Sequence, residues 1–128
     1  MTVNECYEQA VSLLPEKPEE NADMERFALT WCNLLLAENL VYENICRRAK
    51  SLPEIEEIPK VFSKEEEIPF CDEFVRRVFP YGMARFVFRE NDDIAGSYEF
   101  YQLYLNAISE ATPLEVSEVE DIYRMGGE

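Results

Sequence analysis

Apolar residues recur with the period of an α-helix near the N-terminus of the chain. In residues 3–14 they stand at i, i+4, i+7, i+8 and i+11, which places them on one face of an amphipathic helix. A longer helix is expected to begin at Asn21 or Asp23, either of which can cap it, and to run to about Lys50 with a bend around Glu38. The pattern therefore predicts two helices that each bury one stripe in a common core.

A stretch that contains three prolines follows, between residues 51 and 71. Proline lacks a backbone N–H and fixes φ, so a long helix is excluded there. Apolar residues nevertheless continue along the stretch, which we interpret either as an ordered loop or as a short hairpin that pairs the regions around Val61 and Ile68. In both interpretations it belongs to one helical domain, residues 1–111.

A third helix is expected from a cap at Asp72 to about Glu90. Pro80 falls inside the apolar pattern of this helix, which predicts a kink rather than an end. Gly82 and Ala84 belong to the same helix, and their small size would allow a neighbouring helix to approach closely.

Asn91-Asp92-Asp93 supplies a turn and a cap for a fourth helix, which Thr112-Pro113 ends. Aromatic residues cover more than one face of this helix, and they are explained by core packing or by an additional contact with a partner, where tyrosine is enriched. The predicted fold class is mainly α, a small bundle of about four amphipathic helices. The stripe of the fourth helix that is expected to face the core consists of Ile94, Tyr98, Tyr101, Leu105 and Ile108.

The remaining segment, residues 112–128, alternates apolar and acidic residues. It is too short to form a core of its own, and we interpret it as an acidic C-terminal arm that is disordered or is added to a partner as an extended segment. The apolar residues of the arm are candidate partner contacts: Leu114, Val116, Val119, Ile122 and Tyr123.

The charge of the chain excludes several classes of function. Its 128 residues include 12 Lys and Arg against 27 Asp and Glu, a net charge of −15, and no histidine. Such a chain is poorly suited to binding DNA or RNA through the phosphates, and it lacks both the usual general base near neutral pH and the commonest zinc ligand. No phosphate-binding glycine loop, nucleophile elbow or calcium loop is present. We therefore expect a non-enzymatic protein without metal or cofactor.

The four cysteines, Cys6, Cys32, Cys46 and Cys71, lie far apart and form no C-x-x-C pair. We expect buried, reduced thiols in a cytosolic protein. The N-terminus has no signal-peptide pattern, and no apolar run has the length of a membrane span, so no association with a membrane is expected.

Basic residues gather on the second and third predicted helices, whereas acidic residues crowd the loops and the arm. The arginines either pair with acids of the same chain or form a face that meets the acidic segment of another subunit, as in a head-to-tail ring. With the arm, the candidate interface comprises Arg47, Arg48, Arg76, Arg77, Arg85, Arg89, Tyr101 and Tyr104.

Residues 66–84, EEIPFCDEFVRRVFPYGMA, combine an acidic-Ile-Pro-aromatic motif, an acidic helix cap and a Pro-Tyr-Gly-apolar-Ala motif. The pattern extends upstream to residues 34–38, and downstream to residues 91–93 and the tyrosines Tyr98 and Tyr104. On these residues the chain resembles the head–tail connectors of tailed phages, which are also called head completion or adaptor proteins.

The resemblance covers about residues 1–110 and implies a helical, non-enzymatic subunit. Such subunits assemble as a homo-oligomeric ring beneath the portal protein, extend the DNA channel and provide a seat for the next tail component. The implied location is the neck of the virion, after assembly in the bacterial cytoplasm from subunits that are monomeric in isolation. The resemblance also implies that the arm reaches the portal or a neighbouring subunit, and it carries over no catalytic residue.

An acidic channel wall would repel DNA and let it pass without specific binding. An alternative function is that of an acidic regulatory protein that mimics DNA and occupies a basic site on a partner, which requires rigid carboxylates across one face. The candidate channel-facing acids are Glu54, Glu56, Glu57, Glu65, Glu66 and Glu67.

Overall fold

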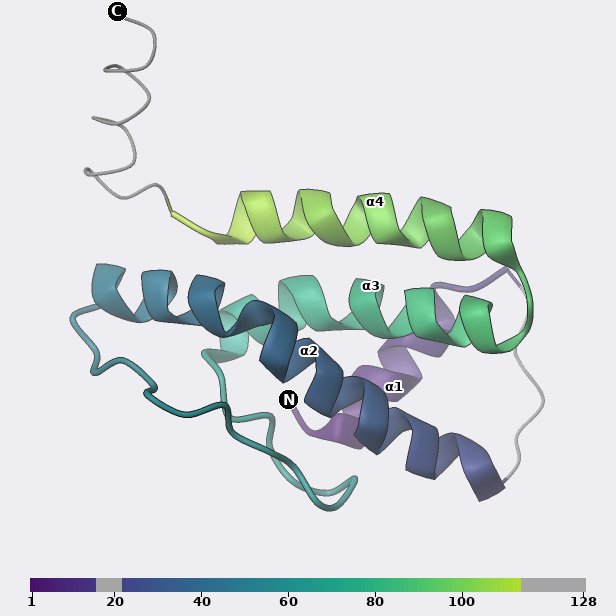
Figure 1. Ribbon diagram of the computed structural model, residues 1–128, viewed down its shortest axis with the longest axis horizontal. Coiled ribbons are helices and arrows are strands. Elements are labelled where there is room, and N and C mark those ends of the chain that lie inside the picture. Colours follow the sequence, from purple (N-terminus) through teal and green to yellow (C-terminus); the bar gives the residue numbers. More distant parts are fainter. Residues whose placement is uncertain (16–21, 114–128) are drawn as a thin grey trace, which may run out of the picture.

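The computed structural model describes residues 1–15 and 22–113, and these residues form four helices connected by loops and turns (Figure 1). No strand is present among them, which confirms the mainly α fold class. An isolated antiparallel bridge joins Thr2 to Glu67. The helices are α1 (Val3–Ser12), α2 (Ala22–Ala49), α3 (Asp72–Glu90) and α4 (Ile94–Ala111).

Helix α3 is the central element, because the other three helices pack against it (Figure 1). From Phe74 to Phe88 most of its side chains are buried, Pro80 included, and the helix does not end at this proline. Trp31 of α2 stacks between Phe27 and Phe86, with ring centroids 5.8 and 6.2 Å apart. Burial of this apolar surface is the main stabilising contribution to the fold.

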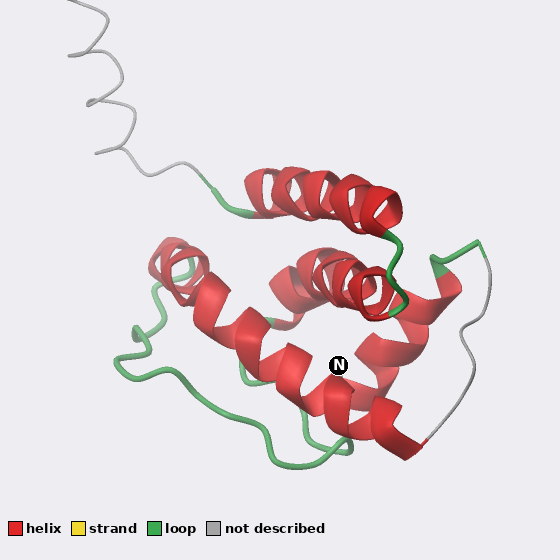
Figure 2. Cartoon of the chain, turned by 45° about the vertical axis from the view of Figure 1, so that its right-hand side comes forward, coloured by secondary structure: helices red, strands yellow, loops and turns green. Residues whose placement is uncertain are grey.

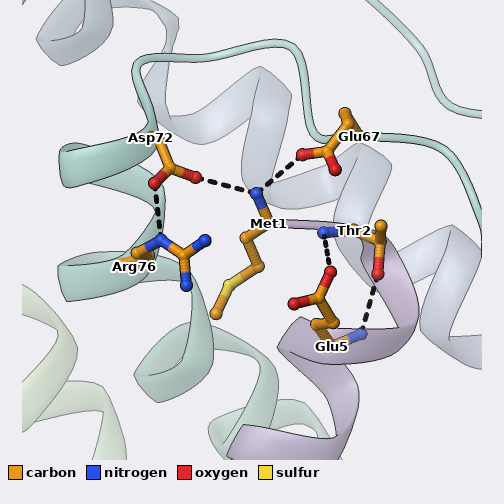
Figure 3. Close-up of polar contacts among 6 residues, drawn as sticks. All are labelled: Met1, Thr2, Glu5, Glu67, Asp72 and Arg76. Carbon is orange, nitrogen blue, oxygen red and sulfur yellow. Dashed lines mark hydrogen bonds and ion pairs between the residues drawn. The ribbon is translucent and has the colours of Figure 1, made fainter.

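The helix starts follow ordinary capping chemistry with one departure from the prediction. Thr2 Oγ1 accepts from the Glu5 N–H and the Glu5 carboxylate accepts from the Thr2 N–H, a capping box that starts α1 (Figure 3). Asp93 caps α4 as predicted by accepting from the Gly96 N–H at 2.9 Å. The cap predicted at Asp72 is wrong by one residue, because Cys71 occupies the cap position and Asp72 is the first residue of α3.

The stretch between residues 51 and 71 is a loop, and the hairpin alternative is not formed in it (Figure 2). Val61 and Ile68 do not pair with each other. Both side chains are buried in the hydrophobic core, and their backbone N–H groups donate to other parts of the chain. The Val61 N–H donates to Asn33 Oδ1 at 2.9 Å, and the Ile68 N–H donates to the Met1 carbonyl at 2.9 Å. A side chain of α2 and the backbone of the residues before α1 thus supply the hydrogen-bond partners that a second β-strand would have provided.

Two asparagines of α2 hold this loop with both halves of their amide groups. Asn33 Nδ2 donates to the Val61 carbonyl at 3.0 Å while its Oδ1 accepts from the Val61 N–H. Asn44 makes the same pair of bonds to Ile55, at 3.0 and 2.8 Å. We call these two pairs the asparagine clamps. Because Ile55 bonds near the end of α2 and Val61 nearer its start, the loop runs back along the helix.

A buried carboxylate fixes the far end of the loop. Glu43 of α2 is fully buried, and both of its oxygens accept from the Cys71 N–H, at 2.9 and 3.0 Å. Arg47 Nε neutralises the same carboxylate at 2.7 Å. The start of α3 is therefore attached to α2 through a charge-assisted hydrogen bond.

The stripe predicted to face the core from α4 is wrong for most of its residues. Ile94 and Tyr98 are 83% and 67% exposed, and Tyr101 and Leu105 are also exposed, whereas Ile108 is buried as predicted. The other buried residues of α4 are Tyr104 and Ala107.

The reason for this orientation lies on α3. A Cβ at Gly82 would come within 2.9 Å of the Tyr104 ring and 2.5 Å of Leu35 Cδ2, so the glycine makes the space into which Tyr104 packs. The small residue predicted to allow close approach of a helix does so, and it selects which face of α4 is buried.

Candidate functional site

Helices α2, α3 and α4 enclose an open cleft of about 630 Å³. Helix α4 lies above α3 and packs mainly on it (Figures 1 and 2). We call the cleft the α2–α4 cleft, after the two outer helices that contribute to its lining. Its lining residues are Glu38 of α2, Arg85 and Arg89 of α3, Asp92 of the turn, and Ile94, Ser97, Tyr98 and Tyr101 of α4.

Arg85 forms the charged floor of the cleft. It is only 4% exposed, and its Nη2 donates to the Glu38 carboxylate at 3.0 Å. Its guanidinium carbon lies 5.2 Å from the ring centroid of Tyr101 and 4.8 Å from that of Tyr104, within the range of a cation–π interaction. In the described residues the buried Nε of Arg85 has no hydrogen-bond partner. Arg85 is therefore an incompletely bonded cation held between aromatic rings.

Tyr104 continues the polar network beneath the floor. Its hydroxyl donates to Glu38 Oε1 at 2.8 Å and accepts from Asn39 Nδ2 at 2.6 Å. Burial, together with the charge of Glu38, raises the pKa of the Tyr104 hydroxyl. Asn39 Nδ2 also donates to the Leu35 carbonyl one turn earlier in α2, a type of contact that bends helices, and α2 changes direction about halfway along its length (Figure 1).

The mouth of the cleft carries an exposed cation. The guanidinium carbon of Arg89 lies 5.6 Å from the centroid of the Phe86 ring. Across residues 1–15 and 22–113, no acidic side chain forms an ion pair with Arg89. Ser97 Oγ donates to the Arg85 carbonyl at 3.2 Å, which attaches the first turn of α4 to α3. The cleft thus offers arginines beside tyrosine rings, an arrangement suited to an acidic segment with apolar side chains.

The structure brings three of the predicted interface residues together in this cleft, namely Arg85, Arg89 and Tyr101. Tyr104 lies buried beneath them. Arg76 and Arg77 line a separate depression of about 250 Å³ between α1, α3 and α4.

The arginines at the end of α2 have bonds within the chain. Arg47 pairs with Glu43 and also donates to the Pro53 carbonyl at 3.2 Å, and Arg48 pairs with Glu54. These two residues thus secure the start of the loop, and they lie outside the α2–α4 cleft. The candidate arm residues Leu114, Val116, Val119, Ile122 and Tyr123 lie outside the described residues.

The candidate channel acids divide into bonded and exposed groups. Glu54 pairs with Arg48, and Glu66 accepts from the Phe62 N–H at 3.2 Å. Glu67 pairs with the N-terminal ammonium group at 2.7 Å. The remaining three are exposed on the loop: Glu56, Glu57 and Glu65.

The N-terminal ammonium group forms a second polar cluster (Figure 3). The ammonium nitrogen of Met1 lies 2.7 Å from carboxylate oxygens of both Glu67 and Asp72, and Asp72 also pairs with Arg76. Burial lowers the pKa of the ammonium group, but the hydrogen bonds that it donates to Asp72 and Glu67 outweigh this effect and raise the pKa above 8.0. The cluster joins α1, the loop and α3 at one point.

All four cysteines are free thiols. Burial raises the pKa of Cys6 and raises that of Cys32 to about 12, so both thiols are protonated at neutral pH. Burial also raises the pKa values of Cys46 and Cys71, and Glu43 adds to both shifts. Within the described residues, no group of three or more Cys, Asp or Glu side chains is arranged to hold a metal ion.

Comparisons with protein families, with curated proteins and with solved structures found no significant match to this chain. Among the described residues, no helix combines the length and the apolar character that crossing a bilayer requires.

Sequence reasoning missed five residues of the cleft as site residues. It assigned Ile94 and Tyr98 to the core, and it gave Glu38 and Asp92 no more than roles in a bend and a turn. One signal was available: apolar residues occupy two faces of α4, and only one of them can pack on α3. The five missed residues are Glu38, Asp92, Ile94, Ser97 and Tyr98.

Proposed function

We propose that this chain is a non-enzymatic assembly subunit of the head–tail connector type. It binds the portal protein of a tailed phage, assembles there as a ring that extends the DNA channel, and provides a seat for the next tail component. Its place is the neck of the virion, after assembly in the bacterial cytoplasm. The resemblance over residues 66–84 supplies the family, and the α2–α4 cleft supplies a binding surface.

One observation carries the binding function: a regular helix presents apolar and aromatic side chains to solvent from its first residue to Leu105. Ile94, Tyr98, Tyr101 and Leu105 lie at i, i+4, i+7 and i+11 of α4, and all are exposed. Contiguous exposed apolar surface of this kind marks interaction sites in soluble proteins. Tyrosine and arginine, which dominate the energetics of many interfaces, both line the adjoining cleft.

The polar groups of the cleft support binding rather than catalysis. Glu38 is occupied by Arg85 and Tyr104, and the Ser97 hydroxyl donates to a backbone carbonyl. A nucleophile needs an adjacent base, and among the described lining residues no such pair stands out. The same groups can orient a docked segment through hydrogen bonds and charge.

The loop acids support a surface that DNA passes without binding. Glu56, Glu57 and Glu65 are exposed on the loop. The loop as a whole runs on the side of the molecule away from α4 (Figure 1). If α4 contacts the portal or a neighbouring subunit, the loop is free to face a channel. Carboxylates there would repel the phosphates of DNA.

The test is binding of the purified chain to the purified portal ring encoded in the same genome. We expect a defined complex by sedimentation, and we expect Ile94→Ser to weaken binding by about tenfold or more, as for a central interface residue. Phe62→Ser is the matched control, because Phe62 is 78% exposed but lies in the loop. Both substitutions are expected to leave the melting temperature almost unchanged, since neither side chain is buried.

Two results would overturn the proposal. One is a portal ring that does not bind the chain under any salt condition. The other is tight binding of the chain to the basic site of a nucleic-acid enzyme, which is the expectation for a DNA mimic. For the channel surface, a ring structure with the loop acids outside and arginines around the bore would contradict the assignment.

A further inference from the structure

Helix α4 exposes a row of apolar side chains at the spacing by which two helices pack along each other. The helix lies at the outer edge of the described residues (Figure 1). Successive members of the row are separated by four, three and four residues, which is the alternation of the core positions in a coiled coil. We call this row the α4 seam, and all of its residues are exposed: Ile94, Tyr98, Tyr101 and Leu105. The seam spans about one and a half heptads, so a partner helix needs further contacts beside it.

The α2–α4 cleft beside the seam offers such contacts. On α2, Leu34 and Val41 are 47% and 63% exposed, and they lie four residues before and three after Glu38, on the side of the helix that lines the cleft. With the seam they expose roughly 600 Å² in each copy, at on the order of 200 Å² for a large side chain in full exposure. Two copies would bury about 1,200 Å² there, which is the lower limit for a specific, reversible interface.

The charge of the chain restricts where two copies can meet. Each copy carries a net charge of −15, so two copies repel each other over most of their surfaces. The cleft is an exception, because its two arginines are balanced by Glu38 and Asp92, and the seam has no charged residue. The two acids of α4, Glu99 and Glu110, lie outside the seam. A second copy therefore meets little repulsion at this face.

Arg89 and Asp92 give one end of the cleft charges that complement each other between copies. Both residues line the cleft and are exposed, three positions apart. Within residues 1–15 and 22–113, neither forms an ion pair with another side chain. A two-fold axis parallel to α4 brings the same end of two copies together, so Arg89 of each lies at the same end as Asp92 of the other. Antiparallel α4 helices would separate these residues, which favours the parallel arrangement.

We propose that free subunits form a two-fold dimer in which the α4 helices of two copies lie side by side and parallel. Identical seams face each other, Leu34 and Val41 of each copy border the α4 helix of the other, and Arg89 pairs with Asp92 in both directions. This isologous contact closes at two copies and does not extend into a ring. The dimer departs from the monomer that the resemblance implies for isolated subunits. If the proposed function holds, the dimer covers the surface that binds the portal and dissociates before assembly.

Sedimentation equilibrium of the full-length chain over a range of concentrations tests the dimer. We expect a reversible monomer–dimer equilibrium at roughly micromolar concentrations, as for a small interface. Ile94→Ser is expected to weaken dimerisation by about tenfold or more, whereas Phe62→Ser, which is exposed in the loop, should leave it unchanged. A chain that is monomeric at every concentration, or that forms larger oligomers, overturns the proposal. A dimer that Ile94→Ser does not weaken also overturns it.

Exchange of charges between two variants tests the parallel arrangement. Arg89→Glu and Asp92→Lys each place like charges opposite each other twice, so each variant alone should dimerise about tenfold more weakly or worse. An equal mixture of the two variants restores two attractive pairs, and we expect it to dimerise almost as the natural chain does. Arg77→Glu makes the same change in net charge but lies in the separate depression, so it should not rescue Asp92→Lys. A mixture that dimerises no better than either variant alone contradicts the arrangement.

A further variant controls for the backbone at position 92. Asp92 has a positive φ of 58°, which asparagine tolerates better than lysine. Asp92→Asn removes the charge without adding strain, and it should weaken dimerisation less than Asp92→Lys while leaving the melting temperature unchanged. Dimerisation that Asp92→Asn leaves unaltered would contradict the pairing with Arg89. None of these measurements includes the portal, so failure of the dimer and failure of the proposed function are distinguishable.

Discussion

The loop between residues 51 and 71 and helix α4 differ in how they are attached to the rest of the molecule. The loop has no regular secondary structure, yet asparagine clamps, the Glu43 carboxylate and the N-terminal ammonium group bond it from several sides. Helix α4 has a complete helical backbone, yet it packs mainly on α3 and leaves one apolar face exposed.

The difference follows from where backbone hydrogen bonds are satisfied. A helix satisfies its own N–H and C=O groups, so it needs only one buried stripe and its other face is free to bind a partner. The loop, which is not part of a sheet, takes its partners from side chains of α2 and from the backbone of the residues at the start of the chain. Polar side chains are therefore committed to structure around the loop, and the surface that we propose for binding lies on α4.

The largest effect on the loop is expected from Glu43→Ala. The substitution leaves the Cys71 N–H and the Arg47 guanidinium without their shared partner, and removing one side of a buried ion pair costs about 3 kcal/mol or more. Urea unfolding measures the loss. Glu43→Gln, which keeps an acceptor for Cys71, is expected to lose less, and equal losses for the two variants would show that the charge on Glu43 carries the whole effect.

The attachment of α4 is tested by Gly82→Ala. The new Cβ would meet Leu35 Cδ2 at 2.5 Å and the Tyr104 ring at 2.9 Å, and overpacking of this kind costs about 2 kcal/mol. Relative to the natural chain, we expect amide exchange to accelerate more in α4 than in α1, because the clash forces α4 away from α3. The double variant Gly82→Ala with Leu35→Ala should lose less stability than the sum of the two single variants, because Leu35→Ala removes one of the crowded side chains. Purely additive losses would contradict a direct clash.

A smaller loss is expected from breaking one asparagine clamp. Asn44→Ala removes two hydrogen bonds to Ile55, each worth about 1 kcal/mol at most where the loop stays accessible to water. Amide exchange should increase at Ile55 and leave α4 unchanged. Asn44→Asp keeps the acceptor and loses the donor, so it should be intermediate, and a neutral Asn44→Ala would show that apolar packing alone holds the loop.

The smallest expected effect is the pH dependence of the N-terminal cluster, in a chain that begins at Met1. Hydrogen bonds from the Met1 ammonium and Arg76 hold the pKa of Asp72 below 3.8, so its contribution is present above that value and is lost as pH falls through the lower, folded-state pKa. The raised pKa of the ammonium gives a contribution present below pH 8.0 and lost as pH rises through the folded-state value.

The stability difference between the natural chain and Asp72→Asn should therefore be greatest between about pH 4 and pH 8, and should shrink on both sides. Denaturant unfolding across this range measures it. Acetylation of the Met1 amine should reduce the same difference at neutral pH, and a difference that does not vary with pH would show that the ion pair does not contribute.

The helices could be predicted because their determinants are local. Periodic apolar residues, the cap at Asp93 and the continuation through Pro80 depend on neighbours within a few residues. The loop, although it lacks periodicity, was correctly restricted by its prolines to an irregular form or a hairpin. The choice between these two depended on Asn33 and Asn44, which belong to another element and gave no signal in the local pattern.

The candidate site was harder to predict because α4 has two apolar faces. Residues from Phe100 to Ala111 carry one stripe at helical spacing, and residues from Ile94 to Leu105 carry another. Periodicity cannot rank two stripes of equal quality. The choice depended on Gly82, whose missing side chain accepts Tyr104, and this contact joins residues far apart in the sequence.

The asparagine clamps also define where the chain can be lengthened. They fix Ile55 and Val61, and the residues between these positions, 56–60, are exposed apart from Pro59, which is half-buried. An insertion there adds length between two fixed points without moving either of them, and insertions are tolerated best at such exposed positions. A peptide epitope placed after Glu57 would be displayed on the surface, opposite the face of α4 that is available to a partner.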